Sequence, residues 1–196
     1  MKFKIYKFKK ISSTNDYAIN FIKNKNIKYG YVHADLQTKG RGTSYKKWIS
    51  QEGNLFGSIF FPLKKKYPKF HEFLFINSII LFNLISNISK DNRLTIKWPN
   101  DILLNRKKIC GILQEVIKIK NLDYIVIGIG INLVTNPNIK IKKTGNILSE
   151  TNVLINKMKV VKGIVSSYEK FFSKIDSYNF KYYKDKANSL SINLDK

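Results

Sequence analysis

The chain of 196 residues has one cysteine, Cys110, and two histidines, His33 and His71. A single cysteine excludes an intrachain disulfide and any cysteine-rich metal site. The two histidines lie far apart in the sequence and lack the spacing of metal-ligating pairs, so we predict no metal-binding residues. A lone thiol fits a reducing compartment, and we therefore expect a cytoplasmic protein.

Acidic residues are also scarce. The chain has 13 Asp and Glu against 36 Lys and Arg, which gives a formal net charge of +23. This excess raises the hypothesis of a nucleic-acid or other anionic partner. Nearly all of the cations are lysines spread along the whole chain, and Ile and Asn are plentiful, as an AT-rich coding bias would produce. We therefore favour a solvated basic surface and expect no specific nucleic-acid site.

Long hydrophobic runs are absent. The most apolar stretch, residues 73–85, is interrupted by Asn77 and Asn83. It is shorter than the roughly 20 apolar residues that a membrane-spanning helix needs, so a buried core helix is expected. The basic N-terminus alternates charged and apolar residues and lacks the apolar stretch of a signal peptide. We therefore expect no association with a membrane.

No linker rich in Pro, Gly or Ser divides the chain, so residues 1–196 are expected to form a single domain. Apolar residues at helical spacing predict helices, over 14–25, 70–88 and 160–175. Short β-prone runs predict strands, over 2–10, 31–36, 54–61, 94–98, 102–104, 109–119 and 124–133. The polar stretches 37–48 and 135–143 are predicted loops. The short connections favour an α+β fold with a mixed, largely antiparallel sheet packed with helices.

The first predicted loop contains Gly40-Arg41-Gly42. Two glycines allow backbone N–H groups to approach a phosphate, and Arg41, Lys46 and Lys47 add positive charge. A simple exposed turn explains the same residues equally well. The third glycine of a dinucleotide-binding fingerprint is missing, so that interpretation is rejected.

Two further motifs each allow two interpretations. Residues 97–101 have the sequence Lys-Trp-Pro-Asn-Asp, which suits either a functional site or a strand bulge with Trp98 in the core. Lys108 follows this motif. A catalytic role for it competes with an ordinary surface position, because most lysines lie at the surface. Glycines within the apolar run 128–132 indicate close backbone approach or a bulge. Asn132, at the end of that run, places an amide near a ligand or caps a turn.

The order and spacing of the motifs resemble the biotin–protein ligase family from about residue 8 to residue 175. The resemblance is carried by Ser13-Thr14-Asn15, Gln37 with Gly40-Arg41-Gly42 and Trp48, Lys97-Trp98-Pro99-Asn100-Asp101, Lys108-Ile109-Cys110-Gly111-Ile112-Leu113, and Gly128-Ile129-Gly130-Ile131-Asn132. It implies a fold like that of class II aminoacyl-tRNA synthetases and lipoate ligases. It also implies two substrates, biotin and ATP with Mg²⁺, which form biotinyl-5′-AMP. Biotin then passes to a lysine of a biotin carboxyl carrier protein domain, such as that of acetyl-CoA carboxylase.

The resemblance also implies a role for each matching residue. Lys108 and Arg41 match catalytic positions. Biotin-binding positions are matched by Ser13, Thr14, Asn15, Gln37, Gly40, Arg41, Gly42, Lys108 and Gly111. Nucleotide-binding positions are matched by Trp48, Lys97, Asn100 and Asn132. Hydroxyls and an amide suit a ureido group, and cations offset the repulsion between a carboxylate and ATP. Asp101 is expected mainly to order its turn.

The loop departs from the family's usual pattern, in which a further glycine and often an arginine precede the tryptophan. Here Thr43, Tyr45 and Lys46 stand at the altered positions. A lysine ammonium is a compact point charge, whereas an arginine guanidinium can donate two parallel hydrogen bonds to one anion. We therefore predict that the adenylate is retained less tightly.

Relatives also set expectations for the whole protein. We expect neither an N-terminal helix-turn-helix nor the small SH3-like C-terminal domain, and hence no repressor function. A homodimer through a sheet edge is expected by analogy. Two alternative functions stay open: an octanoyl or lipoate transferase on the same fold, and a basic nucleic-acid-binding module.

Overall fold

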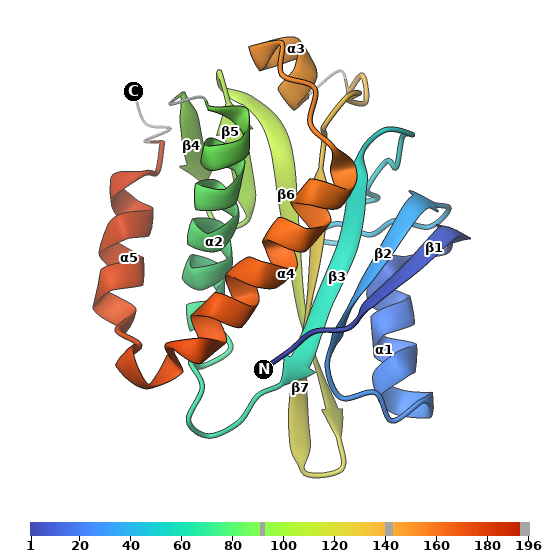
Figure 1. Cartoon of the computed structure of the whole chain (residues 1–196), viewed down its shortest axis with the longest axis vertical. Coiled ribbons are helices and arrows are strands. Elements are labelled where there is room, and N and C mark those ends of the chain that lie inside the picture. Colours follow the sequence, from blue (N-terminus) through green and yellow to red (C-terminus); the bar gives the residue numbers. More distant parts are fainter. Residues whose placement is uncertain (91–92, 140–142, 193–196) are drawn as a thin grey trace.

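The computed structural model describes residues 1–90, 93–139 and 143–192. Its centre is a seven-stranded sheet with the order β1-β2-β3-β7-β6-β5-β4 (Figure 1). The strands are β1 Ile5–Ile11, β2 Gly30–Gln37, β3 Leu55–Pro62, β4 Leu94–Lys97, β5 Asp101–Leu104, β6 Lys107–Ile119 and β7 Leu122–Ile131. β1 pairs with β2 in parallel, and the other neighbouring pairs are antiparallel. The predicted mixed, largely antiparallel α+β fold is confirmed.

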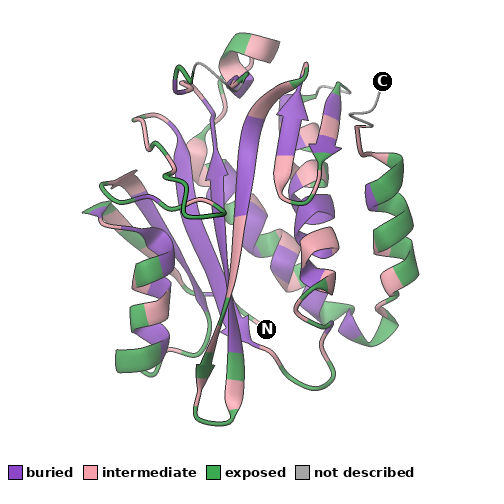
Figure 2. Cartoon of the chain, turned by 180° about the vertical axis from the view of Figure 1, so that it is seen from behind, coloured by how far each residue is buried: buried purple, intermediate pink, exposed green. Residues whose placement is uncertain are grey.

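The helices lie on both faces of the sheet. They are α1 Thr14–Asn24, α2 Glu72–Ser89, α3 Ile147–Thr151, α4 Lys157–Ser173 and α5 Phe180–Ser189, with a 3-10 turn η1 at Ile175–Ser177. Figures 1 and 2 show α1 on one face and α2 and α4 on the other. The larger hydrophobic cluster fills the space between the sheet and α2 and α4, and a smaller cluster lies beneath α1. The α1 face is therefore only partly covered by helices.

The predicted start of the first helix agrees with the structure. Ser13 is the N-cap of α1, and its side chain accepts a hydrogen bond from the backbone N–H of Asp16. The cap ends β1 and turns the chain, so that the buried side chains of Thr14 and Asn15 lie at the first turn of α1. The residues between β1 and α1 thereby place polar groups beside the sheet.

Among the described residues, α2 is the one helix long and apolar enough to cross a membrane by length and composition. Half of its residues are buried inside the fold. Phe73, Ile76 and Leu81 belong to the larger hydrophobic cluster, which also includes side chains of α4. The packing supports the interpretation of α2 as a core helix.

The C-terminal helix α5 was not expected from the sequence. The helix is mostly polar, and Ala187 is its one buried residue. The segment after it runs beside β4: Ile96 N–H donates to Leu190 O (2.9 Å), and Ile192 N–H donates to Ile96 O (3.0 Å). Part of the second predicted loop, residues 140–142, lies outside the described residues.

Candidate active site

A cavity of about 760 Å³ opens on the α1 face of the sheet. Side chains alternate along a strand, so Gly111 of β6 and Gly128 and Gly130 of β7 face the cavity, while Ile127 and Ile131 are buried in the core. All of the predicted site residues except Gly40 line it, namely Ser13, Thr14, Asn15, Gln37, Arg41, Gly42, Trp48, Lys97, Asn100, Lys108, Gly111 and Asn132. The fold therefore brings together motifs that lie far apart in the sequence.

Gly40 shapes the loop from outside the cavity. A Cβ atom there would lie 2.6 Å from the carbonyl oxygen of Trp48, a distance that real Cβ atoms do not adopt. The two residues are joined by a hydrogen bond from Trp48 N–H to Gly40 O (2.9 Å). Gly40 thus permits the close backbone contact that directs Trp48 toward the sheet.

Polar side chains line the end of the cavity next to α1, and those of Thr14 and Asn15 are buried. Gln37 Oε1 accepts hydrogen bonds from the backbone N–H (2.8 Å) and hydroxyl (3.1 Å) of Thr14. Gln37 Nε2 donates to Ser50 Oγ at 3.1 Å. Ser58 of β3 lies behind them, with its Oγ 2.7 Å from Thr14 Oγ1 and 2.5 Å from Asn15 Oδ1. This end provides fixed donors and acceptors.

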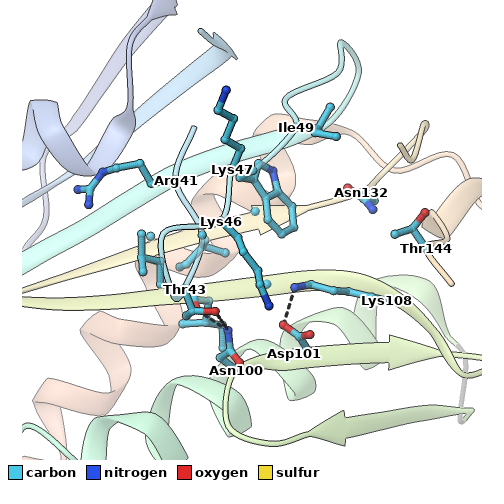
Figure 3. Close-up of a pocket in the computed structure, with 18 of the residues that line it drawn as sticks. Arg41, Thr43, Lys46, Lys47, Ile49, Asn100, Asp101, Lys108, Asn132 and Thr144 are labelled. Atoms are coloured by element: carbon cyan, nitrogen blue, oxygen red, sulfur yellow. Dashed lines mark hydrogen bonds and ion pairs between the residues drawn. The ribbon is translucent and has the colours of Figure 1, made fainter. Parts of the chain in front are cut away.

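Lys108 lies near the middle of the cavity, where Figure 3 shows its ammonium directed at Asp101. Lys108 Nζ is 2.6 Å from Asp101 Oδ1 and 5.3 Å from the centroid of the Trp48 ring. Its backbone is held by hydrogen bonds to Lys143 O (2.9 Å) and from Gly145 N–H (3.0 Å). Asp101 was expected mainly to order its turn; in the structure it lines the cavity and holds the Lys108 cation.

Trp48 rests on a pair of glycines that face each other across β6 and β7. Gly111 and Gly130 are direct partners in the strand register. A Cβ atom would lie 2.5 Å from the indole at Gly111 and 2.4 Å from it at Gly130. The two glycines therefore leave a flat surface on which a planar ring fits, and the indole of Trp48 lies there.

Asn132 provides an acceptor at the other end of the cavity. The residue is 2% exposed, and its Nδ2 donates to Gly145 O at 2.9 Å. Its Oδ1 is buried and has no hydrogen-bond partner within the described part of the chain. A buried acceptor without a partner is unfavourable, so Asn132 is ready to accept a hydrogen bond from a ligand.

Arg41 is held by two carboxylates. Its guanidinium donates two hydrogen bonds to Glu115, each at 2.7 Å, and lies 2.8 Å from Asp16 Oδ1. The hydrogen bonds to Glu115 raise the pKa of Arg41 further above its usual value. In Figure 3 the Arg41 side chain points away from Lys108 and Asp101. Lysines and an arginine with no part in these pairs also line the cavity, namely Lys46, Lys47, Lys97, Arg106 and Lys143.

Several of these residues were missed by sequence analysis. Strand alternation from Gly111 places Glu115 on the same face of β6, so its position was open to prediction, but its pairing with Arg41 was not. The wall formed by Pro137, Ile139 and Thr144 comes from a stretch without any pattern. No group of three or more His, Cys, Asp or Glu that could hold a metal ion lies within residues 1–90, 93–139 and 143–192.

Residues 7–132 match the model of the Biotin/lipoate A/B protein ligase family, and the chain belongs to this family. It is 32% identical over 180 residues to the bifunctional ligase/repressor BirA of Bacillus subtilis, a match that covers 87% of this chain and 54% of that protein. It is 26% identical over 157 residues to the biotin–[acetyl-CoA-carboxylase] ligase of Paracoccus denitrificans, covering 76% of this chain and 65% of that protein. The chain thus spans about half to two thirds of the length of these relatives.

The fold is shared with solved biotin protein ligases. The enzyme from Aquifex aeolicus, solved in complex with biotin and ATP, superposes with a TM-score of 0.81 at 27% sequence identity. The match covers 96% of this chain and 78% of the Aquifex chain. Together with the family match, this similarity confirms the family that the motifs indicated.

Proposed function

We propose that this chain activates biotin with ATP to form biotinyl-5′-AMP and then transfers biotin to a lysine of a carrier protein. One observation carries the proposal: a single cavity holds Lys108 and Trp48 between a polar end at Thr14 and Gln37 and an acceptor at Asn132. The relatives and the Aquifex complex with biotin and ATP point to the same substrates.

The first step places two anions in contact. A biotin carboxylate oxygen attacks the α-phosphorus of ATP, the bond to the bridging oxygen breaks, and pyrophosphate leaves. Lys108, held by Asp101 at 2.6 Å, offsets the charge at the reacting centre. Mg²⁺ bound to the phosphates would lower their charge, and it would be held chiefly by phosphate oxygens because the described residues hold no acidic cluster for it.

In the second step, the amine of the acceptor lysine attacks the acyl carbon of the mixed anhydride and AMP leaves. The amine loses a proton as the amide bond forms. The indole of Trp48, which lies on the glycine floor formed by Gly111 and Gly130, supplies a flat apolar surface for the intermediate. The role of this indole is to hold the adenylate until the acceptor arrives.

The polar end of the cavity suits the biotin head group. A ureido group has one carbonyl acceptor and two N–H donors. The hydroxyls of Ser13 and Thr14 and the amides of Asn15 and Gln37 can donate to the carbonyl and accept from the N–H groups. Gly40 and Gly42 allow the neighbouring loop to approach. We assign these residues to biotin binding, with Arg41 tying the loop in place.

The opposite end suits the nucleotide. The buried Oδ1 of Asn132 fits a donor such as the exocyclic amine of adenine. Asn100 donates from Nδ2 to Ile112 O at 3.2 Å and thereby fixes the turn that carries Lys97. We assign Asn132, Asn100, Lys97 and Trp48 to the nucleotide.

Biotin-dependent exchange between ATP and pyrophosphate tests the proposed function. The exchange is measured with biotin and with lipoate side by side, at saturating ATP and Mg²⁺. We expect exchange with biotin alone, because the Lys97–Asp101 motif favours the biotin branch of the family. Exchange with lipoate alone would support the alternative transferase, and no exchange with biotin would contradict the proposal. Steeply salt-dependent DNA binding without exchange would favour the nucleic-acid alternative.

We propose a biotin carboxyl carrier domain of a carboxylase as the acceptor and the cytoplasm as the location. The name of the Paracoccus relative, a biotin–[acetyl-CoA-carboxylase] ligase, supports this class of partner. The buried free thiol of Cys110 fits a reducing compartment. Mixing the enzyme with such a domain, biotin and ATP should give one biotin per domain, measured by mass spectrometry.

We also propose a homodimer through the outer edge of β6. β5 pairs with β6 only as far as Gly111, and no described strand pairs with the outer side of residues 113–119. Val116, on this free edge, is 47% exposed. The N–H of Ile112 points outward to Asn100 O, so the N–H of Val116 points outward too.

A second copy that pairs along this edge would satisfy these unpaired backbone groups. Val116→Pro removes an outward donor and should give monomers in sedimentation velocity, whereas Val116→Thr should leave the dimer intact. A wild-type chain that is monomeric at all concentrations would contradict the homodimer.

A further inference from the structure

Glu115 lies outside the cavity and contacts two residues that line it. Its Oε1 and Oε2 accept hydrogen bonds from Arg41 Nη1 and Nη2, each at 2.7 Å. Its Oε2 also accepts a hydrogen bond from Asn15 Nδ2 at 2.6 Å. The Glu115 side chain is 25% exposed. One side chain of β6 thus joins the first turn of α1 to the Arg41 loop.

The Asn15 side of this connection is rigid. Asn15 Oδ1 lies 2.5 Å from Ser58 Oγ on β3. A Cβ atom at Gly128 would lie 2.5 Å from the same oxygen, so the amide is packed directly on the backbone of β7. Glu115 therefore receives one of its hydrogen bonds from a group fixed to the centre of the sheet.

The Arg41 side belongs to a loop that otherwise contacts the sheet region through the Trp48 indole on Gly111 and Gly130 and through a hydrogen bond from Asn100 Nδ2 to Thr43 Oγ1 (3.4 Å). Arg41 and Lys47 form an isolated antiparallel bridge, and Gly42 N–H donates to Lys46 O at 2.7 Å. These contacts make the loop a small unit that leads directly into Trp48. Asp16 adds one contact to Arg41 at 2.8 Å, from a side chain that is 46% exposed. The bidentate pair with Glu115 is therefore the stronger tie.

We propose that Glu115 is a positioning residue: through Arg41 it holds the loop that carries Trp48 against the sheet and thereby limits escape of the adenylate intermediate. The inference rests on the proposed function and names the group that controls retention at the same site. It assigns Arg41, whose charge is already matched by two carboxylates, to holding the loop.

Glu115→Gln tests this role, because the new amide N–H would face the guanidinium donors of Arg41. We expect release of biotinyl-5′-AMP from the enzyme to become about tenfold faster, as loss of a charge-assisted pair implies. Tryptic cleavage after the exposed Lys46 and Lys47, followed by mass spectrometry, should accelerate by a similar factor. Asp16→Asn is the matched control, with less than about threefold change in both, because the bidentate pair is retained.

A double-mutant cycle separates positioning from general destabilisation. In an Arg41→Ala background, Glu115→Gln should have no further effect on release, since its partner is gone. Equal effects in both backgrounds, or unchanged release and cleavage in Glu115→Gln alone, would overturn the inference. If Glu115→Gln does not fold, Arg41→Lys provides the second test. It removes the two parallel hydrogen bonds of the guanidinium but keeps the positive charge, and it should also speed release of biotinyl-5′-AMP.

The cleavage assay needs no substrate and remains informative without activity. A wild-type chain without biotin-dependent exchange would refute the proposed function, while faster cleavage of Glu115→Gln would still support the tie between Glu115 and the loop.

Discussion

Lys108 differs from the other lysines of the chain in its surroundings. Its ammonium is held by Asp101 and lies beside the Trp48 ring, with 21% of the side chain exposed. The preceding residue, Lys107, pairs with Glu150 at 2.8 Å and is 44% exposed. Lys107 does not line the cavity, since neighbouring side chains on a strand point to opposite faces. Two adjacent lysines thus offer a matched pair for testing the site.

Replacing Lys108 with alanine should lower biotin-dependent exchange by roughly 100-fold or more, because the cation that offsets charge at the reacting centre is lost. Lys107→Ala should change exchange by less than about threefold, as expected for a partly exposed ion pair. Both variants are compared by initial rates at saturating biotin and ATP. Equal losses in the two variants would show that Lys108 has no special role.

The glycine floor allows a second test. Gly130→Ala would place a methyl group 2.4 Å from the indole of Trp48, and β7 cannot retreat because it is paired on both sides by β3 and β6. Trp48 must therefore move, and we expect about a tenfold loss of exchange with a shift in tryptophan emission. Gly163→Ala on α4 is the control, because its Cβ meets the flexible end of Leu84. Unaltered emission in Gly130→Ala would contradict the placement of Trp48.

Between secondary-structure elements, β2 and α4 are joined by a polar cluster. His33 of β2 is fully buried, with Nδ1 3.0 Å from Phe56 O and Nε2 3.7 Å from Asp35 Oδ1. Asp35 also pairs with Lys157 of α4 at 2.7 Å. Burial lowers the pKa of His33 below its usual value, so folding favours the neutral imidazole.

The depressed pKa of His33 predicts a loss of stability on acidification. The unfolded chain takes up a proton near pH 6.5 and the folded chain does so only at lower pH, so the free energy of unfolding falls as the pH drops below 6.5. The slope is at most about 1.4 kcal/mol per pH unit for one proton. Urea unfolding at several pH values between about 5.5 and 7.5 measures it. His33→Asn should remove this contribution and His71→Asn should retain it; an unchanged slope in His33→Asn would refute the assignment.

At the scale of the whole molecule, the formal charge of +23 sets the long-range field. An acidic carrier domain would be attracted over distances comparable to the Debye length, about 10 Å at 0.1 M salt. We expect the second-order rate of biotin transfer to fall about tenfold or more between low salt and about 0.3 M. Exchange with pyrophosphate, which needs no carrier, is the internal control and should change little. Transfer that does not depend on salt would assign the lysines to solubility alone.

The sequence by itself determined the family, the sheet strands, the main helices and most of the residues around the cavity. Each of these follows from local features: periodicity over a few residues, caps such as Ser13, and short motifs whose order is preserved along the chain. Where the local pattern was weak, the prediction failed. The helix α5 is mostly polar and buries a single residue, Ala187, so no apolar stripe marked it as a core helix.

Only the tertiary structure decided which of these groups meet. Arg41 and Glu115 are 74 positions apart, and nothing in their local sequence indicates that they pair. Their contact depends on where β6 lies relative to the loop, and the register of the sheet determines this position. The same register sets Gly111 opposite Gly130 beneath Trp48 and brings Asp101 to Lys108. Strand pairing brings residues that are far apart in the sequence close together in space. The motifs are local and could be recognised in the sequence, whereas the contacts that hold the loop depend on this pairing and could not.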